Sequence, residues 1–244
     1  MQQKPAQTLS RWVGMARADP LLACGAIAGP LFVLTFSIDG ATRTDYNPLR
    51  HPVSSLVLGD VGWIQVVNFL AAGALGVAFA LGLRRALRPF GGSTWGPLLV
   101  GTWATGLFGA GVFVTDPVSG YPLGTPGKLT RYASTHAALH DGVSFVAFMA
   151  LAAACFVFAR RFAGWGRPAW AIYSAATGIV FTVAFALSNL GFDQTEGLVS
   201  LGGLFQRIAI TVAWCWLSLL ALHLLRHDAP RQSTGGRPGA VNAS

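Results

Sequence analysis

Residues 136–159 read HAALHDGVSFVAFMALAAACFVFA, and this stretch sets the class of fold that we expect for the chain. From Gly142 to Ala159 it contains no charged residue. As a helix rising about 1.5 Å per residue, the stretch is long enough to cross a hydrocarbon core of about 30 Å. Its first turns hold His136, His140 and Asp141. The stretch therefore predicts a transmembrane helix with a polar site at one membrane surface.

The composition of the whole chain agrees with a membrane protein. Of the 244 residues, 53% are hydrophobic and 11% are charged, whereas a soluble domain carries about 25% charged residues. So few charges cannot cover a water-exposed surface. The formal net charge of +8 arises from short basic clusters between apolar runs, so it indicates membrane topology and not a nucleic-acid partner.

Six apolar runs are long enough to be membrane spans. They cover about 20–38, 62–83, 95–115, 136–159, 169–189 and 203–225. None alternates between apolar and polar residues, so we expect helices and not the strands of a barrel. The prediction is an all-α, polytopic membrane domain over residues 20–226, built from three helical hairpins. Residues 1–19 are expected to form a cytoplasmic lead and 227–244 a disordered cytoplasmic tail.

Basic residues are distributed unevenly between the two ends of these spans. Twelve of the 17 form four sets of three on one side: Lys4, Arg11, Arg17; Arg84, Arg85, Arg88; Arg160, Arg161, Arg167; and Arg226, Arg231, Arg237. The other side holds Arg43, Arg50, Lys128 and Arg131, with Arg207 at the start of the sixth span. The positive-inside rule then predicts cytoplasmic termini and hairpins that point outward from the inner membrane.

Three aspartates near the outer ends of spans are evenly spaced. Asp39, Asp116 and Asp193 follow one another at intervals of 77 residues (116 − 39 and 193 − 116). A triplicated hairpin would produce this spacing, and so would three unrelated hairpins of similar length. The aspartates either stop helices near the headgroups or form a ring of carboxylates that faces the histidine pair.

Several short motifs, taken in order, resemble a known family. They are the Gly- and Pro-containing first span, His51-Pro-Val-Ser-Ser-Leu, Gly62-Trp63 with Asn68, Thr115-Asp116-Pro117, His136-x3-His140-Asp141, and Gly203-Leu204-Phe205-Gln206-Arg207. Over roughly residues 20–226 the chain is similar to the six-span prokaryotic membrane family of domain of unknown function 998. The resemblance implies the six-span architecture and no established chemistry.

His136 and His140 are the first candidates for a functional site. Residues four apart on a helix differ by about 40° around the axis and by roughly 6 Å along it. Two imidazoles at this spacing can share a zinc ion, which needs a third protein ligand and an open position for water. His51 or Asp116 would be that third ligand. The simpler alternative is a pair of interfacial histidines that hydrogen-bond to backbone and water.

Four further residues complete the candidate site. Asp39 and Asp141 are candidates for a base beside the metal, and Ser54 is a candidate nucleophile or, more simply, a helix cap. Arg207 lies on the acid-rich side, where we expect it to pair with an acid or to bind a lipid phosphate. The acids within reach are expected to be Asp39, Asp116, Asp193 and Glu196.

Two classes of function follow from these candidates. The first is a metal-assisted hydrolase or transferase, using zinc, that acts on a lipid at the outer leaflet. The alternative is a small-molecule or cation transporter, or a membrane module that binds a headgroup without catalysis. The middles of the six spans are almost free of ionisable residues, which argues against a carrier because carriers bind their coupling ions near the midplane. A structural scaffold is what remains if the polar groups prove dispensable.

Overall fold

The computed structural model describes residues 19–91, 94–128 and 132–227. Its six α-helices are α2 (Pro20–Thr42), α3 (Trp63–Leu87), α4 (Trp95–Val112), α5 (Thr135–Gly164), α6 (Pro168–Phe192) and α7 (Gly202–His227). Two short 3-10 helices, η2 (Val53–Val57) and η3 (Arg88–Phe90), lie in the connections. Within the described ranges the regular structure is helical, as the sequence predicts. The expectations for residues 1–18 and 228–244 lie outside the described residues.

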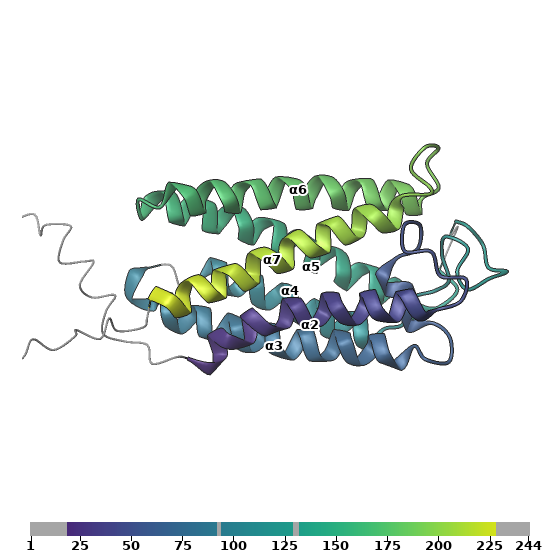
Figure 1. Cartoon of the computed structure of the whole chain (residues 1–244), viewed down its shortest axis with the longest axis horizontal. Helices are drawn as coiled ribbons and strands as arrows, with labels where there is room; N and C mark the ends of the chain where they lie inside the picture. The colour runs from purple at the N-terminus through teal and green to yellow at the C-terminus, as the bar shows by residue number, and fades with distance from the viewer. Residues whose placement is uncertain (1–18, 92–93, 129–131, 228–244) are drawn as a thin grey trace, which may run out of the picture.

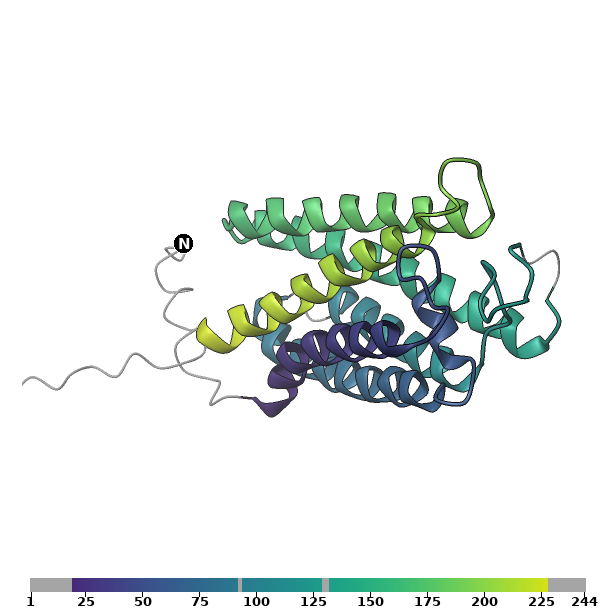
Figure 2. The same cartoon turned by 45° about the vertical axis from the view of Figure 1, so that its right-hand side comes forward.

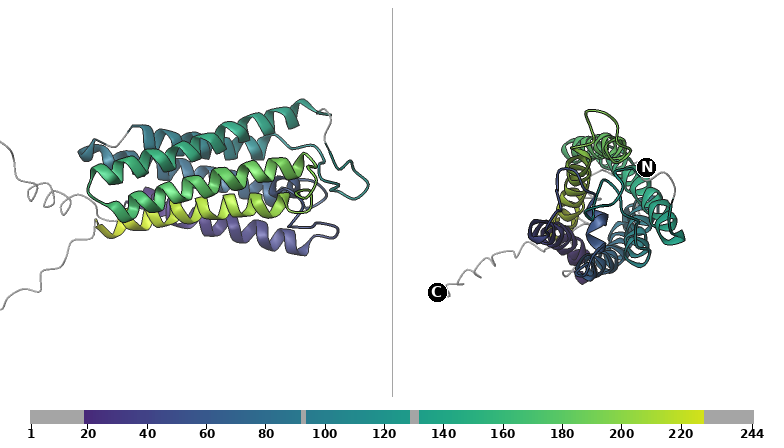
Figure 3. Two further views of the ribbon diagram at one scale, coloured as in Figure 1. Left: turned by 90° about the horizontal axis from the view of Figure 1, so that it is seen from above. Right: turned by 90° about the vertical axis from the view of Figure 1, so that its right-hand side faces the viewer.

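The six helices form a ring in which chain neighbours are also neighbours in space. Each helix packs on the next, and α2 packs on α7, which closes the ring. The end-on view shows this arrangement, with the connection after α2 lying over the centre of the ring (Figure 3). A ring of this kind leaves room on its axis for a site that all six helices can line.

The longest connections gather at one end of the ring, which we call the loop end. They follow α2, α4 and α6 (Figures 1 and 2). The opposite end, which we call the arginine end, holds the start of α2 and the end of α7, together with the last turns of α3 and α5, which contain Arg84, Arg85 and Arg161. The polar site that the sequence places at one surface therefore corresponds to the loop end.

Five of the described helices are long and apolar enough to cross a membrane: α2, α3, α5, α6 and α7. Large apolar side chains such as Leu34 (60% exposed) and Ile172 (70% exposed) point outward from the ring, where lipid would cover them. The chain is thus a multi-pass membrane protein. The eighteen-residue α4 is rich in glycine and is not among the five, so a sixth span and the membrane orientation stay predictions.

Local sequence explains where the helices begin and end. Asp19 caps α2 by accepting a hydrogen bond from Leu21 N (2.9 Å), and Ser134 caps α5 by accepting one from Ala137 N (3.1 Å), as N-cap residues do. Most helices run further than the predicted spans, because polar residues at their ends still follow helical geometry. The exception is α4, which ends at Val112 and not at residue 115, since Phe113 is already extended.

The evenly spaced aspartates occupy three different settings. Asp39 lies inside α2, which continues for three more residues. Asp116 lies in the connection beyond α4, and Asp193 is the C-cap of α6. The interval of 77 residues therefore does not correspond to a repeated structural position.

Candidate functional site

A cavity of about 680 Å³ lies inside the ring, toward the loop end. All six helices and η2 contribute to its lining, for example Phe32 from α2, Phe69 from α3, Leu107 from α4 and Ile210 from α7. This volume falls in the range of small-molecule sites in proteins, about 300–1,000 Å³. Because the ring is closed around the cavity, the cavity is the natural place to look for a ligand.

The deep part of the cavity is aromatic. Phe148, Phe181 and Phe185 form a stack, with the rings of Phe148 and Phe185 centred 4.4 Å apart and 27° from parallel. Trp103 and Trp214 pack edge to face with centroids 4.4 Å apart and also line the cavity. Aromatic faces carry partial negative charge, so these walls favour an apolar body or a bulky organic cation.

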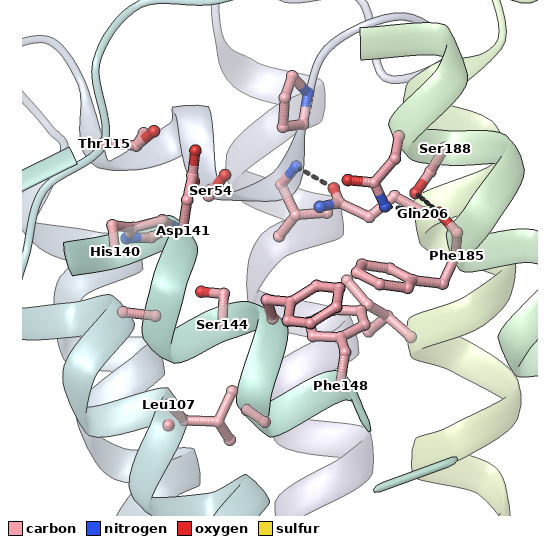
Figure 4. Close-up of a pocket in the computed structure, with 18 of the residues that line it drawn as sticks. Ser54, Leu107, Thr115, His140, Asp141, Ser144, Phe148, Phe185, Ser188 and Gln206 are labelled. Atoms are coloured by element: carbon pink, nitrogen blue, oxygen red, sulfur yellow. Dashed lines mark hydrogen bonds between the residues drawn. The ribbon is translucent and has the colours of Figure 1, made fainter. Parts of the chain in front are cut away.

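The mouth of the cavity is polar. Figure 4 shows Ser54, His140 and Asp141 on one side and Ser188 and Gln206 on the other, with the phenylalanine rings below them. The cavity surface is thus divided along the ring axis, with polar groups at the loop end and aromatic groups toward the middle of the ring. An amphiphilic molecule matches that division.

Asp141 supplies the available negative charge at the mouth. Its Oδ2 accepts a hydrogen bond from the Tyr132 hydroxyl (2.9 Å), and the hydrogen bonds of the described residues leave Oδ1 unpaired. Tyr132 also lines the cavity. Burial and the carboxylate of Asp141 raise the pKa of Tyr132, so the hydroxyl stays a donor at neutral pH.

The other two carboxylates of the lining are already engaged. Asp116 accepts from Ala133 N (2.7 Å), Ser134 N (3.2 Å) and Ser134 Oγ (3.0 Å), so it fixes the start of α5. Asp193 lies 3.6 Å from Lys128, and both side chains are more than half exposed. Among the described lining residues there is no lysine or arginine. Asp141 is therefore the lining carboxylate that has no basic partner and keeps one oxygen unpaired among the described residues.

His140 is buried at the mouth and is held in one orientation. Its Nδ1 lies 2.6 Å from the Phe113 carbonyl oxygen, and because a carbonyl only accepts, Nδ1 carries the proton and donates. This arrangement leaves Nε2 as an acceptor. His140 lines the cavity, so it can accept a hydrogen bond from a ligand.

His136 and His140 both lie against Phe113, but they differ in burial and in the part of Phe113 that each contacts. His136 is exposed and packs edge to face on the Phe113 ring (centroids 5.7 Å apart), whereas His140 is 3% exposed and contacts the Phe113 carbonyl. The extended chain leaving α4 lies against both imidazoles. Within the described ranges, no group of three or more His, Cys, Asp or Glu could hold a metal ion. The described residues therefore do not fit a zinc centre.

His51, the predicted third ligand, belongs to the connection between α2 and α3. Its Nδ1 accepts a hydrogen bond from Asn47 N (2.9 Å), and its ring packs against both Tyr46 and Tyr121, with centroids 5.5 and 5.2 Å away. Burial, together with the positive charge of Arg50, lowers the pKa of His51. The residue is a neutral, packed part of the loop and stabilises its conformation.

Asp39 pairs with Arg43 and not with the histidines. Arg43 Nε and Nη2 donate to Asp39 Oδ1 (2.9 Å) and Oδ2 (3.0 Å), and the guanidinium also donates to the carbonyls of Leu58 and Leu56, each at 2.7 Å. Both side chains are buried. A carboxylate with both oxygens occupied by a bidentate partner is a structural anchor and not a free base.

Arg207 binds backbone oxygens where an acidic partner was expected. Its Nη1 donates to the carbonyls of Pro48 (2.6 Å), His51 (3.0 Å) and Gly203 (3.1 Å), and Nη2 donates to the Tyr46 hydroxyl (2.5 Å). The guanidinium also lies over the Phe36 ring (5.8 Å). These contacts join the start of α7 to the α2–α3 connection, so this arginine holds the loop against α7.

Gln206 lines the mouth as well, and it is an uncharged member of the Gly203-Leu204-Phe205-Gln206-Arg207 motif that was not among the predicted site residues. Its Oε1 accepts from Val53 N (2.7 Å), which fixes η2 against α7 and leaves its amide nitrogen for a ligand. The neighbouring Gly203 allows this contact, because a Cβ there would lie 2.6 Å from the carbonyl oxygens of Pro48 and His51. In the sequence, the only signal is that Gln206 follows Gly203 by about one helical turn at the start of an apolar span.

The comparison with known families agrees with the motifs. A family model described as protein of unknown function (DUF998) matches residues 26–223, which covers all six helices of the ring almost completely. The chain belongs to the DUF998 family. No curated protein and no solved structure matches this DUF998 protein. Its activity therefore has to be inferred from the cavity.

Proposed function

We propose that this DUF998 protein binds an amphiphilic organic cation in its central cavity, with the apolar body on the aromatic walls and the cationic group near Asp141. The single observation that carries the proposal is the combination of an aromatic cavity of about 680 Å³ with a carboxylate at its mouth. No basic side chain stands among the described lining residues. An anionic ligand would meet Asp141 unshielded, whereas a cation gains both a charge pair and aromatic contacts.

The contacts support binding in preference to metal-assisted hydrolysis. Hydrolysis by zinc requires three protein ligands and a bound water, and within the described ranges no group of three His, Cys, Asp or Glu side chains could hold a metal ion. Ser54 lines the mouth as part of the short helix η2. We therefore assign Ser54, His140, Asp141 and Gln206 as hydrogen-bonding partners of the ligand.

Binding of tetraphenylphosphonium, an apolar cation, to the purified protein in zwitterionic lipid nanodiscs tests the proposal. We expect saturable binding, with quenching of tryptophan fluorescence because Trp103 and Trp214 line the cavity. Asp141→Asn should weaken binding by about fivefold, the upper end for a partly exposed ion pair. Leu107→Trp, which fills the lower part of the cavity, should abolish binding.

Asp60→Asn is the matched control, because Asp60 is an exposed acid in the α2–α3 connection, at the same end of the ring as Asp141, and it does not line the cavity. It should bind the probe as the wild type does. If Asp141→Asn and Asp60→Asn both left the affinity unchanged, Asp141 would not recognise the cationic group and the proposal would fail.

A further inference from the structure

A second hollow lies on the outside of the ring. It has a volume of about 700 Å³ and is lined by α3, α4 and α5. Several of its lining residues are strongly exposed, including Leu81 (51%), Leu98 (54%) and Val146 (56%). Because these apolar side chains face away from the ring, the hollow is a groove on the surface that lipid would cover. We call it the α4 groove.

The groove exists because the outer face of α4 is built from small residues. Its floor includes Gly101, Thr102, Thr105 and Gly106, so α4 is recessed between larger side chains of α3 and α5. Thr102 Oγ1 donates to the Leu98 carbonyl (3.0 Å) and Thr105 Oγ1 to the Gly101 carbonyl (2.9 Å). Because both hydroxyls donate to carbonyl oxygens of their own helix, the floor presents methyl groups and Cα atoms to an occupant.

One end of the groove carries a positive charge. Arg84, in the last turn of α3, is exposed and lines the groove, and Arg85 and Arg88 follow in the same basic set. The other described residues that line the groove are uncharged. An elongated apolar floor with an arginine at one end matches a chain that ends in an anionic group.

We propose that the α4 groove holds one acyl chain of a bilayer phospholipid, whose phosphate contacts Arg84. Gly106, Ala138 and Gly142 line both the groove and the central cavity, so the wall between the two consists of small residues at that level. A chain seated in the groove covers this wall and separates the central cavity from the bilayer. The inference does not depend on what the central cavity binds.

Native mass spectrometry of the protein released from detergent micelles tests this inference with two probes that share their chains. Dioleoyl phosphatidylglycerol should be retained at one copy per protein, and dioleoylglycerol, which lacks the phosphate, should not. Arg84→Gln should weaken phosphatidylglycerol binding about tenfold, the factor expected for one lost hydrogen bond to a charged group.

Two further variants make the test specific. Gly101→Leu should abolish retention by filling the floor, and its Cβ has room because the nearest atom would be Ala80 Cβ at 3.6 Å. Arg161→Gln is the matched control, since Arg161 is an exposed arginine in the last turn of α5 that does not line the groove. It should retain the lipid. Equal retention of both probes, or equal loss in Arg84→Gln and Arg161→Gln, would overturn the proposal in favour of unspecific annular lipid.

Discussion

At the scale of single residues, the charged groups of the loop end separate into anchors and a mouth. Arg43, Arg50 and Arg207 stand out in the sequence because they lie on the side with few basic residues. Each donates to backbone carbonyls: Arg43 to Leu56 and Leu58, Arg50 to Ser119 (2.8 Å), and Arg207 to Pro48 and His51. They hold connections together, so their position reflects loop structure and not membrane orientation.

The Asp39–Arg43 pair offers a first prediction. Asp39→Asn leaves a buried guanidinium without its carboxylate, which should lower the free energy of unfolding by roughly 3–5 kcal/mol. Asp193→Asn is the control, because its pair with Lys128 is exposed and should contribute only about 0–1 kcal/mol. The midpoint of unfolding by dodecyl sulfate would measure both. Similar midpoints for the two variants would show that the buried pair is not an anchor.

The sequence predicted where the candidate residues lie in the molecule more accurately than it predicted which groups they contact. Asp141 and His140 do lie at a polar mouth, because a helix that starts at Thr135 brings its first two turns to the loop end. The metal hypothesis assumed that residues four apart share surroundings. At the level of His136, α4 has already ended and the ring of Phe113 lies there instead. The spacing of residues within one helix does not show where the neighbouring helix ends.

At the scale of elements, the connection 43–62 works as a cap on the ring. It is tied to α7 by Gly203 N→Arg50 O (3.2 Å) and Leu204 N→Leu49 O (2.9 Å), and η2 lies at the cavity mouth. Hydrogen bonds such as Asn47 N→His51 Nδ1 and Arg43 Nη2→Leu56 O pair polar groups of the connection, which lets irregular chain lie against an apolar bundle. Composition could not reveal this, since the same residues would also suit a solvated loop.

This cap should become less stable in acid because of His51. Burial lowers the pKa of His51 in the folded protein. At pH values below about 6.5, the ordinary pKa of histidine, the unfolded chain therefore binds more protons than the folded protein does. The contribution to stability is complete above about pH 6.5 and is lost as the pH falls below it. We expect the melting temperature of wild type to fall between about pH 7.5 and about pH 5.5.

His51→Gln should make that pH dependence shallower, because one of the two buried histidines, His51 and His140, is gone. His136→Gln is its control, since His136 is exposed, and should keep the wild-type slope. Parallel pH profiles for wild type and His51→Gln would contradict the assignment of His51 as a buried neutral histidine.

At the scale of the whole molecule, the sequence predicted six apolar helices in the order in which the described residues show them, and five of these are long and apolar enough to cross a membrane. The closed ring could not be read from the sequence. Apolar length is enough to find α2, α3, α5, α6 and α7. Ring closure depends on the packing of α2 against α7, which are the first and last helices of the chain and share no local signal. The cavity follows from that closure, so its volume and lining required the structure.

Orientation in the membrane is a prediction at this scale. The basic sets at the arginine end predict that this end faces the cytoplasm. In a background with Cys24, Cys155 and Cys215 replaced by alanine, cysteine at the exposed Thr195 should react with an impermeant maleimide on intact cells, and cysteine at the exposed Ala163 should not. Labelling at Ala163 with protection at Thr195 would reverse the orientation.

The most direct test of the cation-binding cavity compares two probes of nearly identical shape and opposite charge. Tetraphenylphosphonium and tetraphenylborate would be dialysed against the protein in phosphatidylcholine nanodiscs, with the partition into protein-free nanodiscs subtracted. The acidic mouth around Asp141 and the aromatic walls predict one saturable site for the phosphonium cation and none for the borate anion. Equal binding of the two probes, or saturable binding of the borate alone, would contradict the account.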